Sequence, residues 1–123
     1  MDGAGETAPP EALPTATGLG EDRIAELADM FRMMGDPTRL SILLSCMDDA
    51  LPVGEIAGRL GLTPSLVSHH LRLLRATRLL KANRRGRRVF YSAVDEHVRC
   101  VLADMVDHVA EPEPDDSDGE AAG

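Results

Sequence analysis

The sequence has no tryptophan, one tyrosine and two phenylalanines among its 123 residues, so its core must consist of aliphatic side chains and methionine. With 43% hydrophobic residues, the chain has room for one small domain with tails, and such a domain buries only a modest core. Association with a second chain would bury more apolar surface. We therefore expect one domain, stabilised by dimerisation.

Cysteine is also scarce. Cys46 and Cys100 are isolated, so the chain has neither a Cys-x-x-Cys motif nor a disulfide framework. No apolar run approaches the roughly 18 residues of a membrane span, and the acidic N-terminus lacks the charged-then-apolar layout of a signal peptide. These absences predict a cytoplasmic protein with reduced thiols and no membrane partner.

Basic residues are absent from both ends of the chain. Residues 1–20 carry three acidic side chains and residues 111–123 carry six, whereas residues 21–110 hold all 13 Lys and Arg against 12 acids. Eight of the bases lie within residues 72–88, which contain no acid. The net charge of −8 therefore hides a compact basic block, which is typical of a phosphate-binding surface, although taken alone it equally fits a solvated charge run.

Segments without periodicity lie on either side of the part expected to fold. Residues 1–20 are rich in Ala, Pro, Gly and Thr, and residues 112–123 are acidic with Pro, Ser and Gly. Such compositions cannot bury enough apolar surface to offset the entropy of ordering, so both segments are expected to be disordered tails. The domain is then expected to span residues 21–111.

Two helices are predicted at the start of the domain. Ile24, Leu27, Ala28, Phe31 and Met34 follow helical spacing. They predict a first helix that begins near Glu21 and stops at Gly35. Asp36 then caps a second helix with Pro37 at its first position. The side chains expected to point inward from this second helix are Leu40, Leu43, Leu44 and Met47.

The segment VGEIAGRLGLTPSLVSHHLRLLRAT predicts a helix-turn-helix. A short helix to Leu60 is followed by a turn at Gly61 and Leu62. The next helix has Thr63 as its N-cap and Pro64 at its first position. Its packing face and its polar, basic outer face each follow helical spacing. The packing face is Val67, His70, Leu71 and Leu74; the outer face is Ser65, Ser68, His69 and Arg72.

A β-hairpin is predicted directly afterwards. Residues 79–84 and 88–92 are two short strand-like runs around a turn that contains Gly86. A helix-turn-helix followed by such a hairpin is a winged helix. The sequence thus predicts a mainly α fold with a small β-hairpin. Four arginines lie at the tip of the hairpin: Arg84, Arg85, Arg87 and Arg88.

The stretch DEHVRCVLADMVDHVAE predicts a last helix with ligand-type side chains at both ends. Asp95 and His97 lie at its start, and His108 and Glu111 lie at its end. Eleven residues of helix rise by about 16 Å, so one straight helix cannot bring both histidines to one ion whose bonds to nitrogen are about 2 Å long. Either the two pairs are unrelated, or a second helix completes each of them.

From Asp36 to Glu111 the sequence resembles the ArsR/SmtB family of dimeric winged-helix repressors, many of which sense metals. The resemblance lies in GDPTRLSILL, SLVSHHLRLLRATRLL, RRGRRVFYS and the spacing Asp-x-His-x10-His-x2-Glu in the last helix. It implies a homodimer through the first and last helices. In such a dimer, Asp95 and His97 of one chain meet His108 and Glu111 of the other, and two-fold symmetry gives two equivalent metal sites.

The donor types favour zinc. Two imidazoles and two carboxylates suit a tetrahedral zinc site, offset its charge and leave no open position for a substrate. Arsenic, cadmium and lead sensors of the family have cysteines near the start of the helix-turn-helix, but residues 51–57 contain none, which excludes a thiolate site there. Nickel and cobalt relatives tend to carry a third histidine or N-terminal ligands, which Glu111 and residues 1–20 do not supply. Cobalt or nickel remains an alternative, since cobalt accepts a similar ligand set.

These features predict a repressor that releases an operator with an inverted repeat when metal binds. The outer face of the second helix-turn-helix element would contact the major groove, and the arginines of the hairpin tip would hold phosphates or the minor groove. One alternative keeps this DNA-binding module but replaces metal with a thiol switch through Cys100, or with no small signal. An enzyme is not predicted, since the sequence lacks an HExxH-type arrangement and the ligand set leaves no open position.

Overall fold

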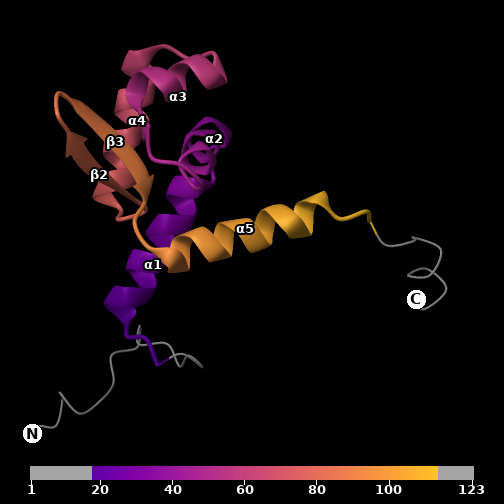
Figure 1. Cartoon of the computed structure of the whole chain (residues 1–123). Helices are drawn as coiled ribbons and strands as arrows, with labels where there is room; N and C mark the ends of the chain where they lie inside the picture. Colours follow the sequence, from indigo (N-terminus) through magenta and orange to yellow (C-terminus); the bar gives the residue numbers. More distant parts are fainter. Residues whose placement is uncertain (1–17, 114–123) are drawn as a thin grey trace, which may run out of the picture.

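The computed structural model describes residues 18–113, within which the chain forms a helix-turn-helix, a small sheet and two further long helices (Figure 1). The elements in chain order are α1 (Glu21–Met34), α2 (Pro37–Ser45), β1 (Leu51–Pro52), α3 (Val53–Leu60), α4 (Pro64–Ala76), β2 (Leu80–Arg85), β3 (Arg88–Ala93) and α5 (Glu96–Ala110). No helix in residues 18–113 is long and apolar enough to cross a membrane. The predicted tails lie almost wholly outside the described residues.

The predicted helix boundaries are confirmed by their caps. The carboxylate of Asp36 accepts a hydrogen bond from the Arg39 backbone N–H at 2.8 Å, and the hydroxyl of Thr63 accepts one from the Leu66 N–H at 3.2 Å. Each bond satisfies a backbone donor that the first helical turn leaves unpaired. Gly61 ends α3 in the left-handed region, with φ of 68°, where a side chain would be strained.

The sheet has three strands in the order β1-β3-β2, all antiparallel. The hairpin was predicted to within one residue at each end. Gly86 and Arg87 connect its strands, and only Gly86 has a positive φ (64°), which is the pattern of a type II′ turn. The third strand was not predicted. Leu51–Pro52 pairs with β3 over two residues, which is too short to show an alternating pattern.

The core lies between α2, α3, α4 and the sheet, and among the described residues no polar or charged side chain is fully buried. Cys46 is completely buried, as expected of a small core residue, and burial raises the pKa of its thiol to about 11. The inward face of α2 differs in part from the prediction. Leu43 is fully buried, as predicted, but so are Ile42 and Cys46, which belong to the same core cluster as the buried face of α4. Leu40, Leu44 and Met47 are only half-buried beside the core.

Helices α1 and α5 bury little of their apolar surface within one chain. No residue of α1 is fully buried, and Phe31 is 57% exposed. Figure 1 shows α5 leaving the body of the molecule, and its only fully buried residue is Leu102. The apolar face predicted for the first helix is confirmed, but much of it is left uncovered by the other described residues, 18–113.

Candidate nucleic-acid interface and metal ligands

Helix α4 separates its two faces as predicted. Val67, Leu71 and Leu74 are fully buried against α2 and α3. Its outer face consists of Ser65, His69 and Arg72, which are exposed, and Ser68, which is half-buried. A helix with one packed face and one polar face can lie in a groove of DNA without giving up core contacts.

His70 connects α4 to the helices before it. Its Nδ1 atom is 3.3 Å from the Arg39 guanidinium, whose Nε also donates to the Met33 carbonyl at the end of α1. Partial burial, followed by the positive charge of Arg39, lowers the pKa of His70, so the neutral ring is favoured. His70 was predicted on the packing face, and this is confirmed in part: the ring contacts Arg39 but is only half-buried.

The wing, strands β2 and β3 with their turn, presents its arginines in two different ways. Arg85 and Arg88 are cross-strand partners at the end of the ladder, and both are exposed. Their guanidinium carbons lie 4.6 Å and 5.4 Å from the centroid of the Phe90 ring. Arg84 belongs to the opposite face of β2 and Arg87 to the turn, and both are exposed.

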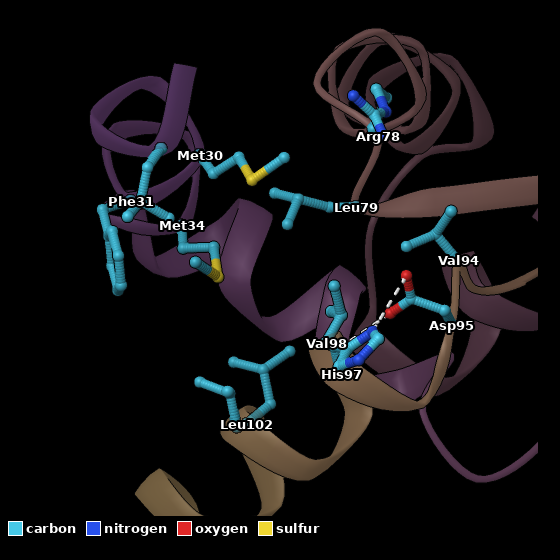
Figure 2. Close-up of a pocket in the computed structure, with 12 residues that line it drawn as sticks. Met30, Phe31, Met34, Arg78, Leu79, Val94, Asp95, His97, Val98 and Leu102 are labelled. Atoms are coloured by element: carbon cyan, nitrogen blue, oxygen red, sulfur yellow. Dashed lines mark hydrogen bonds and ion pairs between the residues drawn. The ribbon is translucent and has the colours of Figure 1, made fainter. Parts of the chain in front are cut away.

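One half of the predicted ligand set is assembled at the start of α5. Asp95 is the N-cap: its Oδ1 atom accepts a hydrogen bond of 3.1 Å from the Val98 N–H. This bond is the main reason why the pKa of Asp95 lies below its usual value. The Oδ2 atom lies 3.6 Å from Nδ1 of His97, so carboxylate and imidazole face each other (Figure 2).

The other half lies at the far end of the same helix. His108 is in the last turn of α5, Glu111 is its C-cap, and both are exposed. Within residues 18–113 of one chain, no three His, Cys, Asp or Glu side chains are placed to hold a metal ion. The structure thus brings Asp95 and His97 together but leaves them apart from His108 and Glu111.

An apolar groove of about 300 Å³ runs between α1 and α5 beside the first of these pairs (Figure 2). Asp95 and His97 lie at its edge, and the side chain of His97 is 95% exposed. The remaining lining is largely apolar: Leu27, Met30, Phe31, Met34, Leu79, Val94, Val98, Val101 and Leu102.

The comparisons with known proteins agree with the fold. A sequence profile described as "Bacterial regulatory protein, arsR family" matches residues 36–82, which run from the cap of α2 into the wing. The transcriptional repressor SmtB homolog of Synechocystis sp. is 37% identical over 90 residues, covering 73% of this chain and 68% of that protein. The chain belongs to the ArsR family.

Solved structures are similar to this chain as well. The NMR structure of the cadmium metal-sensor CmtR from Mycobacterium tuberculosis has a TM-score of 0.60 and 39% identity, covering 72% of this chain and 92% of that one. The homodimeric winged helix-turn-helix domain Mb0332 from Mycobacterium bovis has a TM-score of 0.66 and 27% identity, covering 78% and 90%. The winged helix predicted from the sequence is therefore confirmed, and the relatives named here are regulators or sensors, not enzymes.

The environments of two side chains of this ArsR-family chain were not predicted from the sequence. Leu66, in the first turn of α4, is 39% exposed instead of buried. Phe90 lies under the guanidinium groups of Arg85 and Arg88. The alternation of β3 could have indicated the position of Phe90, because Arg88 and Phe90 share one face two residues apart.

Proposed function

We propose that the protein is a homodimeric ArsR-family repressor that binds operator DNA in the cytoplasm and releases it when zinc binds between the last helices of two chains. One observation carries the proposal: the ligand set on α5 is split. Asp95 and His97 adjoin at its start, His108 and Glu111 lie at its end, and exposed Val101 and Met105 lie between them.

The apolar faces of α1 and α5 support the dimer. Phe31 is 57% exposed, Met105 is 54% exposed and Val109 is 79% exposed. A small domain rarely leaves such side chains in water on neighbouring helices unless they form an interface. The related domain Mb0332 is homodimeric. Antiparallel pairing of α5 with its symmetry mate would cover these side chains and bring the start of one helix to the end of the other.

The donor set supports zinc, with cobalt or nickel as the alternatives. Asp95 uses Oδ1 to cap α5, which leaves Oδ2 beside the His97 ring as a donor. With His108 and Glu111 of a second chain, two nitrogens and two carboxylate oxygens would be available, which suits tetrahedral zinc. The related CmtR is described as a cadmium metal-sensor. The ligand set proposed here contains no sulfur.

The DNA-binding surface would consist of α4 and the wing. Ser65, Ser68, His69 and Arg72 would face the major groove, and the arginines of the wing tip, Arg84, Arg85, Arg87 and Arg88, would contact phosphates or the minor groove. Two-fold symmetry of the dimer implies an operator with an inverted repeat. Metal lowers DNA affinity if it binds better to a dimer shape that fits the operator poorly, and DNA must then weaken metal binding by the same factor.

A thiol switch is the second candidate, because Cys100 is exposed on α5 one turn after His97. Its sulfur lies 3.7 Å from the Glu96 carboxylate. Cys46 is not available for such a role, since it is fully buried. A switch of this kind would respond to oxidants and would be lost in Cys100→Ser.

DNA binding measured by fluorescence anisotropy, with operator fragments selected from random DNA, tests both candidates. We expect the metal-free dimer to bind the selected DNA and zinc to weaken this binding about tenfold or more, which corresponds to a coupling of about 1.4 kcal/mol. Cys100→Ser should behave like the wild type. Binding that ignores every divalent metal but responds to peroxide, and only with Cys100 present, would support the thiol switch instead.

A further inference from the structure

The outer face of the wing carries an aromatic ring beside two of its arginines. Phe90 lies on β3 opposite Asn83 of β2 and is half-buried. The guanidinium carbon of Arg85 is 4.6 Å from the ring centroid and that of Arg88 is 5.4 Å away. Both distances fall within the roughly 6 Å over which a guanidinium is attracted to the negative face of an aromatic ring. One ring therefore contacts cations from both strands.

The strand register explains this arrangement. Arg85 and Arg88 form the last pair of the β2–β3 ladder, and Phe90 follows Arg88 by two residues, on the same face of the sheet. Tyr91 belongs to the other face and packs against the core, whereas Phe90 does not. The ring of Phe90 therefore contacts the two arginines and does not pack against the core.

We propose that Phe90 is a positioning residue for DNA binding, whose ring holds Arg85 and Arg88 as a preorganised pair of phosphate-binding cations. The inference rests on the proposed DNA-binding function. Like charges on cross-strand partners repel each other, and long side chains lose rotamer freedom when they bind. A ring that attracts both guanidiniums before DNA binds offsets their mutual repulsion and restricts their rotamers in advance. Less of the free energy gained from the phosphate contacts is then spent on ordering these side chains.

The other two arginines of the wing provide an internal comparison. Arg84 points to the opposite face of β2, and Arg87 lies in the turn. Neither guanidinium lies over the Phe90 ring. Removal of the ring should therefore weaken the contribution of Arg85 and Arg88 and leave that of Arg84 and Arg87 unchanged.

Binding to random-sequence duplex DNA over a range of salt concentrations tests this inference. Phe90→Leu keeps an apolar strand residue without a ring, and we expect it to lower affinity about 3- to 10-fold, because the side chains of Arg85 and Arg88 must then be ordered when DNA binds. Phe90→Tyr keeps the ring and should stay within about twofold of the wild type. Thermal unfolding should show similar stability for the three proteins. Weak binding by Phe90→Tyr as well, or no loss in Phe90→Leu, would overturn the proposal.

Double-mutant cycles separate positioning from a general structural effect. In an Arg85→Ala/Arg88→Ala background, Phe90→Leu should cause no further loss, whereas in the matched Arg84→Ala/Arg87→Ala background it should cause its full loss. Equal losses in both backgrounds would overturn the role of Phe90 but leave the proposed function intact. A wild-type protein that binds no DNA would instead overturn the proposed function itself.

A fluorescence measurement tests the contact without DNA and without Phe90→Leu. The chain has no tryptophan, so Phe90→Trp supplies a single indole that keeps an aromatic face. Replacing Arg85 and Arg88 with Ala in this variant should shift its emission to longer wavelength, because the indole loses its cover. An unchanged emission would show that the arginines do not lie over the ring in solution, and would overturn the proposal.

Discussion

Asp95 combines two tasks that different substitutions can separate. As N-cap it accepts a hydrogen bond from Val98, and as a proposed ligand it offers its other oxygen beside His97. Asparagine caps a helix about as well as aspartate, whereas alanine costs about 1 kcal/mol. We expect metal-free Asp95→Asn to unfold in urea like the wild type and Asp95→Ala to be less stable by that amount.

Both Asp95 variants should bind zinc at least about tenfold more weakly in a competition with a chelator, because each lacks the carboxylate. Thus Asp95→Asn should lose metal affinity without losing stability. Wild-type zinc affinity in Asp95→Asn would exclude this carboxylate from the site.

His70 should make stability depend on pH. Its pKa is lowered in the folded protein by burial first, then by Arg39, with a smaller effect of His69, while Asp36 acts in the opposite direction. The unfolded chain therefore binds a proton more readily. The stabilising effect of the neutral ring is present above the unfolded pKa of about 6.5 and is lost as pH falls through the lower folded value.

Urea unfolding between pH 8 and pH 5, at one protein concentration, measures this dependence. Glutamine can accept the Arg39 hydrogen bond but does not titrate, so stability should fall less steeply with pH in His70→Gln than in the wild type. His69→Gln removes only the smaller effect of the neighbouring ring on His70, so its slope should differ from that of the wild type much less than the slope of His70→Gln does. Identical slopes for His70→Gln and the wild type would contradict the interpretation.

Leu66 should contribute to sequence preference. It lies in the first turn of α4, where recognition helices contact base edges, and its exposed apolar side chain suits a thymine methyl group. Burial of one methyl group is worth about 0.8 kcal/mol, or about fourfold in affinity. Replacing the contacted thymine by deoxyuracil should weaken wild-type binding by about that factor and leave Leu66→Ala unaffected. If no thymine shows this pattern, Leu66 does not read a methyl group.

At the scale of elements, α5 should decide the oligomeric state. Met105 is 54% exposed and is not among the side chains packed against the core, so the core does not depend on it. We expect Met105→Glu to give a folded monomer at micromolar concentration, because dimerisation would bury two unpaired carboxylates. Sedimentation velocity reports the mass and circular dichroism the fold. The monomer should also lose tight zinc binding.

A control for Met105→Glu is available on the same helix. Asp104→Glu adds no charge at an exposed position of α5 and should leave the dimer intact. A dimer of Met105→Glu that matches the wild type would place the interface elsewhere.

Most elements could be predicted from the sequence because their signals are local. Asp36 and Thr63 cap helices through bonds three residues along the chain, and Gly86 fixes the turn of the wing. Strand β1 could not be predicted, since Leu51 and Pro52 become a strand only by pairing with Tyr91 and Phe90, about 40 residues away. Such a strand depends on tertiary contacts and not on periodicity.

The candidate metal site was predictable only in halves. Spacing showed that His97 and His108 cannot share an ion within one helix, and the structure of one chain indeed keeps the pairs apart. Which surface meets which depends on a second chain. Likewise, the contact of Phe90 with the arginines depends on which residues of β2 and β3 pair with each other, and this register cannot be derived residue by residue from the sequence.

At the scale of the whole molecule, acidic and basic residues are concentrated in different parts of the chain. The net charge of −8 would repel DNA if it were evenly spread, yet α4 and the wing carry most of the basic side chains. DNA affinity should therefore be governed by the local basic surface, as counterion release requires.

The sharpest test of the whole assembly asks whether each metal site is shared between chains. His97→Ala and His108→Ala homodimers should each lose tight zinc binding, because every site in either dimer lacks one imidazole. In a heterodimer of the two variants, one site combines the intact helix start of the His108→Ala chain with the intact helix end of the His97→Ala chain. That site keeps Asp95, His97, His108 and Glu111.

The second site of this heterodimer lacks both histidines and should stay empty. Two affinity tags allow the heterodimer to be purified, and its zinc stoichiometry and affinity can then be measured. One tight zinc per dimer is expected for shared sites. If the ligands came from a single chain, both chains would still be damaged, and mixing would restore none; that result would refute the shared site while leaving the winged-helix fold and its DNA-binding surface untouched.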